Sequence, residues 1–486
     1  MLQNKASYAV SWSVLEQILQ VFFNFAFSVV MARLVTPEDF GTVALLSLFM
    51  GVATVFMNGG LTVAVIQKKD TTREDESTVF WFNIFISLVM GAVIALAAPW
   101  IADFYQKDIL QQLTYALVFV FILSACNSLQ HALFAKHLNM RVSFTINSAS
   151  LIVSVIGGVI MACYGWGVWA LVGQTVVMGL MQTALTWILS DWRPLFCFRK
   201  KSFQELFSFG GYIFLTNLIS ICHDRAYSVL IGRRIGVYDL GIYNRAFTTQ
   251  NMATNALTQV VNRVAFPVFA QCQNEPEKLL RAFRTAQRGV MCLNLPAMLG
   301  IAVVAEPLVH VIYGAPWAEA APILVILCIA ASYFPMQVLN LSLLSSLGKG
   351  ASFLLLEVAK KSMAITLIII ASGYGIHEVA WAVLLSSLIA LSLNTYLTKR
   401  NTGFGLFPQL KDLMPSLISS LGMVISVKLF QHQCPLSIPW VNLLSSVIVG
   451  GLAYIGFSLF LQRPMINDVK MLLKRKFIKS PASISP

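Results

Sequence analysis

Long apolar runs with almost no charge recur along the whole chain and constrain its fold more than any other feature. Examples are Ile84–Ile101, Leu151–Tyr164, Val168–Ser190 and Val441–Leu461. Each approaches the roughly 20 residues that span the hydrocarbon core of a bilayer. Only 11% of the residues are charged, whereas soluble domains carry about a quarter. The sequence therefore predicts an all-α polytopic membrane protein.

The apolar pattern divides the chain into about fourteen spanning helices joined by short loops. They are expected near residues 8–34, 40–66, 79–104, 110–135, 143–163, 167–190, 206–232, 239–270, 286–305, 318–346, 352–373, 377–398, 412–431 and 439–461. The first is too long for the apolar region of a signal peptide, so it is predicted to be retained. No loop is long enough for a catalytic domain outside the membrane, and the chain is not expected to be an enzyme.

The net charge of +13 is distributed by loop. Most Lys and Arg fall in alternate loops and in the C-terminal tail, whereas the intervening loops hold only Arg33, Lys107, Arg233 and Arg234. This is the positive-inside asymmetry, which predicts that both termini lie in the cytoplasm. The basic residues are therefore expected to contact lipid headgroups and not nucleic acid.

The eight cysteines are scattered along the chain without a C-x-x-C pair. Such spacing is typical of packing residues and not of a metal or redox site. No metal and no cofactor are expected.

An internal repeat occurs at an offset of 200 residues. The segment from Phe27 to Gly41 aligns with the segment from Tyr227 to Gly241 without a gap, with identities at Ser, Val, Arg, Asp and Gly. A second, weaker similarity pairs Pro99 and Tyr105 with Pro307 and Tyr313, each pair separated by six residues. Because six helices separate the copies, they share one orientation in the membrane. Two parallel six-helix lobes facing a central cavity are therefore predicted, with residues 1–200 as N-lobe, 201–400 as C-lobe and 401–486 as two extra helices with a basic tail.

Polar side chains gather on one face of the predicted helix 239–270. Its asparagines are spaced 7, 4 and 7 residues apart and fall within about 20° of one line at 100° per residue. They are Asn244, Asn251, Asn255 and Asn262, with Arg245 and Arg263 beside them. Asparagines can simply hydrogen-bond between helices, but a stripe with two arginines predicts a hydrated cationic cavity wall.

Three further helices carry polar or ionisable groups within the predicted membrane region. Arg225 and Asp224 lie in the helix 206–232, and the first helix carries Glu16, Gln20 and Asn24 on one face. Helix 352–373 contains Glu357, Lys360 and Lys361, in which an i,i+4 pair of Glu357 with Lys361 would leave Lys360 available to the cavity. We expect Arg225, Lys360, Gln20 and Asn24 to contact substrate, whereas Asp224, Glu16 and Glu357 are candidates for ion coupling.

A cavity lined by guanidinium, ammonium and carboxamide groups suits an anion that carries many hydroxyls. Guanidinium groups match phosphate oxygens, and carboxamides both donate to and accept from sugar hydroxyls. A phosphate-linked oligosaccharide meets both requirements. The sequence contains no Walker, G-x-S-x-G or H-E-x-x-H motif.

The segment from Ala32 to Gly41 resembles the A-R-x-L-x-P-x-x-F-G turn of polysaccharide transporters in the multidrug/oligosaccharidyl-lipid/polysaccharide (MOP) superfamily, with the Wzx-type, colanic acid exporter-like flippases most similar. The resemblance covers nearly the whole chain. It implies translocation of an undecaprenyl-pyrophosphate-linked repeat unit across the bacterial inner membrane by alternating access. It also implies membrane lipids, a polysaccharide polymerase and export machinery as partners, and we expect a monomer.

Two other functions are compatible with parts of the sequence. An ion-coupled multidrug antiporter of the same superfamily would need an acidic cavity, whereas the predicted one is basic. An integral-membrane polysaccharide polymerase or ligase would present a large external loop with catalytic Arg or His, and the predicted external loops are short.

Overall fold

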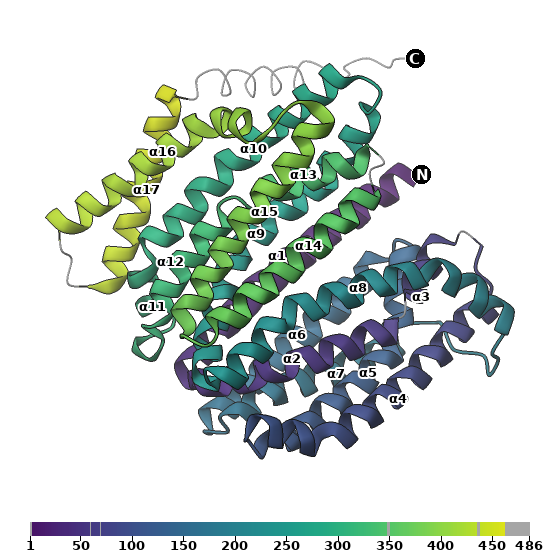
Figure 1. The fold of residues 1–486 in the computed structure, drawn as a ribbon. Helices are drawn as coiled ribbons and strands as arrows, with labels where there is room; N and C mark the ends of the chain where they lie inside the picture. The colour runs from purple at the N-terminus through teal and green to yellow at the C-terminus, as the bar shows by residue number, and fades with distance from the viewer. Residues whose placement is uncertain (1, 59, 69, 348–349, 435–437, 462–486) are drawn as a thin grey trace, which may run out of the picture. The chain divides into compact units, whose positions relative to one another are not determined.

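The computed structural model describes residues 2–58, 60–68, 70–347, 350–434 and 438–461. Within these segments, some side chains in 2–18, 206–223, 256–266 and 350–355 are not described. The described residues form α-helices, one 3-10 turn and their connections, with no strand among them (Figure 1). Packing divides the chain into two compact units, residues 1–244 and 245–486.

The first unit contains eight helices and the start of a ninth. They are α1 (Leu2–Leu34), α2 (Pro37–Asn58), α3 (Leu61–Gln67), α4 (Arg73–Tyr105), α5 (Ile109–Lys136), α6 (Met140–Cys163), α7 (Val168–Leu189), α8 (Lys200–Arg234) and α9 (Val237–Gln271). Helix α8 packs along α2, α3 and α4, so packing places it in the first unit. The lobe boundary at residue 200, which rests on the repeat, remains a prediction.

The second unit contains the rest of α9 and the helices that follow. They are α10 (Pro276–Val303), α11 (Ala305–Ile312), the 3-10 turn η1 (Ala315–Trp317), α12 (Ala320–Ala331), α13 (Phe334–Ser346), α14 (Gly350–Ala371), α15 (Ile376–Thr402), α16 (Leu406–Gln433) and α17 (Pro439–Leu461). Here α16 packs on both α10 and α17.

Eleven helical segments in the described residues are long and apolar enough to cross a membrane. The chain is therefore a multi-pass membrane protein, although the number fourteen is not confirmed. Helices α8, α9 and α14 coincide with three further predicted spans and fall outside the eleven. The expected helix 40–66 is divided into α2 and α3, because Gly60 adopts a left-handed backbone with φ 70°.

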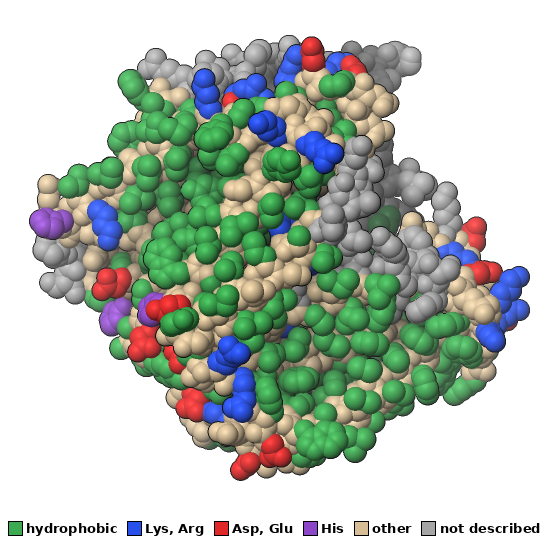
Figure 2. Space-filling view, in the orientation of Figure 1, with side chains coloured by type: hydrophobic (Ala, Val, Ile, Leu, Met, Phe, Trp, Pro, Cys, Tyr) green, Lys and Arg blue, Asp and Glu red, His purple; other side chains and the backbone are tan. Residues whose placement is uncertain are grey.

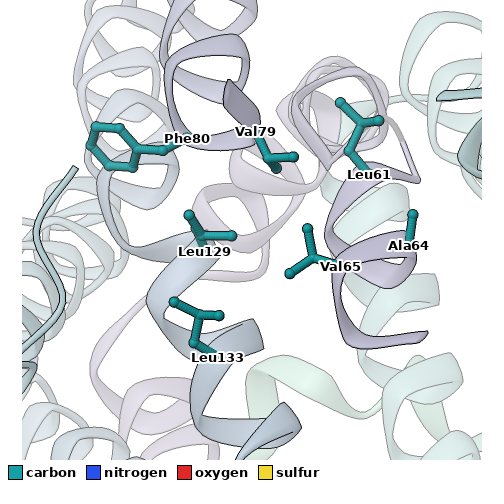
Figure 3. Packing of buried hydrophobic residues seen from close by; sticks show 7 residues of the cluster. All are labelled: Leu61, Ala64, Val65, Val79, Phe80, Leu129 and Leu133. Carbon is teal, nitrogen blue, oxygen red and sulfur yellow. The ribbon is translucent and has the colours of Figure 1, made fainter. Parts of the chain in front are cut away.

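Buried apolar side chains from three helices form one of the cores of the first unit (Figure 3). Leu61, Ala64 and Val65 share one face of α3 by their i, i+3, i+4 spacing. They pack against α4 and α5, and Trp187 and Trp192 cover the cluster. This core fixes the short helix α3 against the start of α4.

Large apolar side chains also lie on the outside of the helices. Leu96 and Trp100 on α4 and Phe460 on α17 are each more than 70% exposed. Figure 2 shows hydrophobic side chains across the helix faces and charged side chains mainly towards helix ends. A soluble protein rarely exposes such an area, whereas a helix surrounded by lipid requires it.

A buried carboxamide cluster attaches α16 to the rest of the second unit. Gln409 accepts hydrogen bonds from Asn340 (3.0 Å) and Gln287 (3.3 Å) and donates to Asn340 and to the Phe404 carbonyl, each at 3.1 Å. All three carboxamide side chains are fully buried. An unpaired carboxamide at this depth costs about 1–3 kcal/mol, so the cluster fixes the register of α16 against α10 and α13.

Candidate functional site

The turn that carries the family-like motif is a helix start built from its own side chains. Asp39 and Thr36 form a reciprocal pair: the Thr36 hydroxyl donates to Asp39 Oδ2 at 2.8 Å, and the Asp39 amide donates to Thr36 Oγ1 at 3.3 Å. Pro37 is the first residue of α2, where its missing N–H costs nothing. The motif therefore fixes where α2 begins and so positions Gly41 one turn later.

A polar network joins α1, α6 and α7 inside the first unit. Glu16 accepts hydrogen bonds from Asn147 (2.6 Å) and from Gln20 (3.3 Å). Asn147 also accepts a bond from Gln182 of α7 (3.3 Å) and donates to Ser143 (3.3 Å). These side chains are half-buried. Glu16 and Gln20 thus belong to one network, whereas Asn24 is exposed, and the functional roles of all three stay predictions.

The sequence did not point to Asn147 and Gln182, because each is a single carboxamide without a charged residue beside it. The signal available was weak. A lone polar residue in a membrane span usually finds a partner on a neighbouring helix, but the sequence does not say which helix that is.

The predicted ionisable pair on α8 lies close to a buried tyrosine. Asp224 is exposed and Arg225 is half-buried, and both lie near enough to the Tyr227 hydroxyl to interact with it. Tyr227 packs against Tyr243 with ring centroids 5.3 Å apart. Arg225 therefore lies at an aromatic contact between α8 and the start of α9.

Arg245 is held between two aromatic rings in the second unit. Its side chain is only 5% exposed, and the guanidinium carbon lies 4.9 Å from the Tyr313 ring centroid and 4.8 Å from that of Trp317. The Tyr313 hydroxyl is 2.8 Å from Thr249 Oγ1. Such cation–π contacts are worth more when desolvated, so the two rings of the α11–η1 turn set the position of this charge.

The asparagine stripe of α9 does not share the environment of Arg245. Asn244 and Asn251 are half-buried and Asn255 is exposed. The face that is buried instead contains Ala246, Gln250 and Thr254. Asn262 and Arg263 lie in α9, but their side chains are outside the described part of the structure. Their contact with substrate therefore stays a prediction.

The charges on α14 pair differently from the prediction. Lys360 forms an ion pair with Glu357, and its Nζ donates to Asn394 of α15 at 3.1 Å. Lys360 is 9% exposed. The expectation that Glu357 pairs with Lys361 and leaves Lys360 available is therefore wrong, because the i,i+3 neighbour reaches the carboxylate and Asn394 supplies the second partner.

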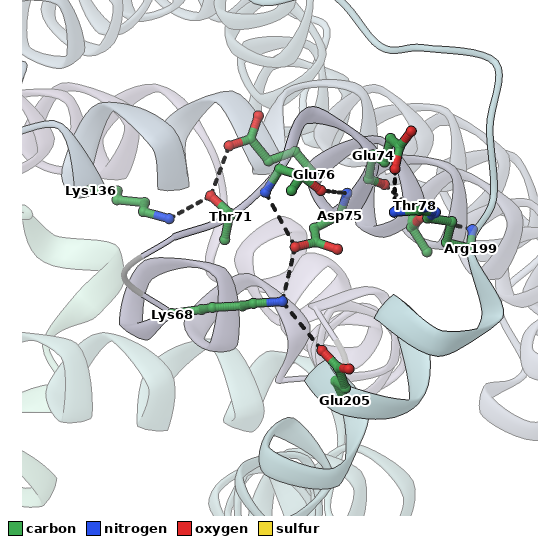
Figure 4. Close-up of polar contacts among 10 residues, drawn as sticks. Lys68, Thr71, Glu74, Asp75, Glu76, Thr78, Lys136, Arg199 and Glu205 are labelled. Atoms are coloured by element: carbon green, nitrogen blue, oxygen red, sulfur yellow. Dashed lines mark hydrogen bonds and ion pairs between the residues drawn. The ribbon is translucent and has the colours of Figure 1, made fainter.

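A second polar network joins the α3–α4 connection to α4, α5 and α8 (Figure 4). The loop charges predict that these helix ends lie on the cytoplasmic side. Lys68, after α3, bonds Asp75 of α4 at 2.9 Å and Glu205 of α8 at 3.4 Å. The hydrogen bond to Asp75 raises the pKa of the Lys68 ammonium. Lys136 donates to Thr71 at 2.6 Å, and Thr71 to Glu76 at 3.0 Å.

The same end of α4 also binds the segment that joins α7 to α8. The Leu195 amide donates to Ser77 Oγ (2.9 Å), the Arg199 amide donates to Thr78 Oγ1 (3.1 Å), and Trp81 donates to the Leu195 carbonyl (2.8 Å). Arg199 also pairs with Glu74. These bonds fix the start of α8 against α4.

The described residues contain no cluster of His, Cys, Asp or Glu that could hold a metal ion. All eight cysteines are free thiols. The chemistry that these sites offer is recognition by charge and hydrogen bonding.

Comparison with known proteins places these features in context. A family model described as polysaccharide biosynthesis protein matches residues 30–322. Teichuronic acid biosynthesis protein TuaB of Bacillus subtilis (strain 168) is 24% identical over 87% of this chain and 88% of that protein. Succinoglycan biosynthesis transport protein ExoT of Rhizobium meliloti (strain 1021) is 22% identical over 97% of each chain.

Two solved structures share the fold. The lipid II flippase MurJ in an inward closed conformation superposes with a TM-score of 0.75 at 15% identity and covers 94% of this chain and 99% of its own. An inward-facing multidrug resistance MATE family transporter of the MOP superfamily gives a TM-score of 0.62 at 14% identity, covering 81% of this chain and 98% of its own. The predicted all-α transporter fold is thereby confirmed.

Proposed function

The chain belongs to the polysaccharide biosynthesis protein family, and we propose that it is a flippase that moves a lipid-linked oligosaccharide from the cytoplasmic to the outer leaflet of a bacterial inner membrane. The observation that carries the proposal is the family match over residues 30–322 on a fold shared with a lipid flippase. Relatives over most of the chain are named for polysaccharide biosynthesis and transport.

The proposed substrate is an undecaprenyl-pyrophosphate-linked repeat unit for exopolysaccharide, capsule or O-antigen synthesis. Its pyrophosphate would be attracted by Arg225, Arg245 and Arg263, and the asparagines of α9 could bond its sugar hydroxyls. Both termini are proposed to be cytoplasmic on the evidence of the loop charges. A polymerase and export machinery that accept the flipped product are the proposed partners.

A reconstitution experiment tests this function. Purified protein is placed in vesicles with undecaprenyl pyrophosphate bearing a fluorescent oligosaccharide, and a membrane-impermeant glycosidase reports which leaflet holds the sugar. We expect leaflet crossing without added nucleotide. A chain that leaves the lipid in its starting leaflet but expels a lipophilic cationic dye would instead be a multidrug antiporter, the function that similarity to the MATE transporter favours second.

Glu16 is the proposed ion-coupling group, because it is the one carboxylate of the α1–α6–α7 network and Asn147 bonds it directly. Gln can accept the same hydrogen bond but cannot bind and release a proton or balance a cation. An imposed proton or sodium gradient should stimulate flipping by the native chain. We therefore expect Glu16→Gln to lower this stimulation about tenfold, which is a typical size for the coupling between two sites. Glu378→Gln, the same change at the exposed start of α15, serves as control. An unchanged response of Glu16→Gln would remove Glu16 from the coupling site.

A further inference from the structure

The two copies of the sequence repeat touch each other at their equivalent glycines. A Cβ atom on Gly41 would lie 1.9 Å from the Val237 carbonyl oxygen and 3.0 Å from the Gly241 amide nitrogen. A Cβ atom on Gly241 would lie 1.9 Å from the Pro37 carbonyl oxygen and 3.1 Å from the Gly41 amide nitrogen. Residues 37 and 237, like 41 and 241, differ by the repeat offset of 200. The contact is therefore reciprocal, as a local two-fold axis between the copies requires.

Only glycine fits at either position. A carbon and a carbonyl oxygen approach to about 3.3 Å at closest, so a methyl group on one glycine would have to move the helices apart by more than about 1 Å. Small residues commonly allow such close helix crossings in membranes. Here both partners of the crossing are glycine, and each faces backbone.

The crossing is sterically exacting but weakly held. Backbone contacts of this kind contribute about 0.5–1 kcal/mol each. Both helices also present their N-terminal ends, whose partial positive charges repel one another. Acidic residues in the first turns, Glu38 and Asp39 on α2 and Asp239 on α9, offset that repulsion. A contact that is sterically specific but contributes little free energy can be broken and formed again in each cycle.

We propose that Gly41 and Gly241 form the contact that closes the outer end of the transport pathway, and that each transport cycle breaks and remakes it. This inference rests on the proposed flippase function and on the outer position that the loop charges predict for residues 35–41 and 235–241. The outer ends of the repeated helices must separate to release a glycan headgroup and must close again before the next one enters from the cytoplasm. The two glycines supply that closure without any side chain.

The first test compares transport by Gly41→Ala, Gly241→Ala and the double variant in the vesicle assay. We expect each single variant to flip lipid at least about tenfold more slowly. The double variant should be close to the slower single one, because one methyl group already prevents the contact and the two positions are strongly coupled. Gly451→Ala and Gly456→Ala on α17, where an added Cβ meets no atom within 4 Å, should transport normally.

The second test measures the crossing itself. Glu38→Cys and Tyr238→Cys, both exposed residues at repeat-equivalent positions beside the contact, carry spin labels in a chain whose eight native cysteines are replaced. A short distance should dominate with native glycines, and Gly241→Ala should move the distribution to longer distances. Joining the two cysteines with a reducible cross-linker should stop flipping, and reduction should restore it, which also keeps the proposal testable if an alanine variant fails to fold.

The outcomes separate this inference from the proposed function. Normal flipping by Gly41→Ala, or by the cross-linked chain, would overturn the closure contact and leave the flippase standing. A chain that never flips lipid but still shows the alanine-dependent change in distance would keep the contact and refute the flippase.

Discussion

Replacing Arg245 with alanine is expected to abolish polysaccharide export while the protein remains in the membrane. Its guanidinium group is 5% exposed and lies within 5 Å of two aromatic ring centroids, so its charge is held at one place. Removing one partner of the proposed pair between this guanidinium and the substrate's pyrophosphate costs about 2–5 kcal/mol of binding, which is about 30-fold or more in affinity. Export is measured as surface polysaccharide, and protein by immunoblot of membranes.

Two further variants make this prediction specific. Arg245→Lys keeps the charge but lacks the planar group that stacks on Tyr313 and Trp317, so we expect partial export. Arg245→Ala with Arg263→Ala should export no more than Arg245→Ala alone. Arg400→Ala, at the exposed end of α15, should export normally. Full export by Arg245→Ala would show that the charge has no part in binding substrate.

The sequence predicts the helices well because hydrophobicity is nearly the only requirement that lipid imposes on a span. It also predicts the repeat, and the Gly41–Gly241 contact is a physical consequence of that repeat. It did not predict the break between α2 and α3, because the apolar pattern continues on both sides of Gly60 and outweighed the turn signal of Asn58, Gly59 and Gly60. The three-turn extension of α10 towards Pro276 was missed because that segment is charged.

The candidate site is harder to predict than the fold. Helical spacing says which residues share a face, and on that basis Arg245 and the asparagines of α9 belong together. The structure separates them by burial, because Tyr313 and Trp317 cover the arginine and leave Asn255 exposed. In the sequence, Tyr313 stands out only as the repeat-equivalent partner of Tyr105. The chain lacks any local signal that this tyrosine would contact α9, since the two positions are 68 residues apart.

The same limitation explains the charges on α14. An i,i+4 rule favours Glu357 with Lys361, but the rule describes an isolated helix. Asn394 lies on the next helix and is fully buried. It accepts a hydrogen bond from Lys360, which positions the ammonium group of this lysine, and Glu357 pairs with that ammonium. Tertiary contact overrides local spacing.

That arrangement leads to a second large effect, this time on stability. Lys360→Met should destabilise the protein by about 3 kcal/mol or more, because it leaves Glu357 without its ion-pair partner in a largely buried position. The lysine side chain is 10% exposed and that of Glu357 23%, so solvent replaces little of the lost interaction. The midpoint of thermal unfolding in detergent measures the change.

The double variant Lys360→Met/Glu357→Leu distinguishes two roles for Lys360, one as a stabilising partner of Glu357 and one as a contact to the substrate. Removing both partners of a buried pair is often neutral, so we expect it to recover most of the stability lost by Lys360→Met. Because Lys360 is already engaged by Glu357 and Asn394, we also expect the double variant to export polysaccharide at close to the normal level. Recovered stability with no export would instead assign Lys360 to the substrate, since the fold would then be intact and only the positive charge missing.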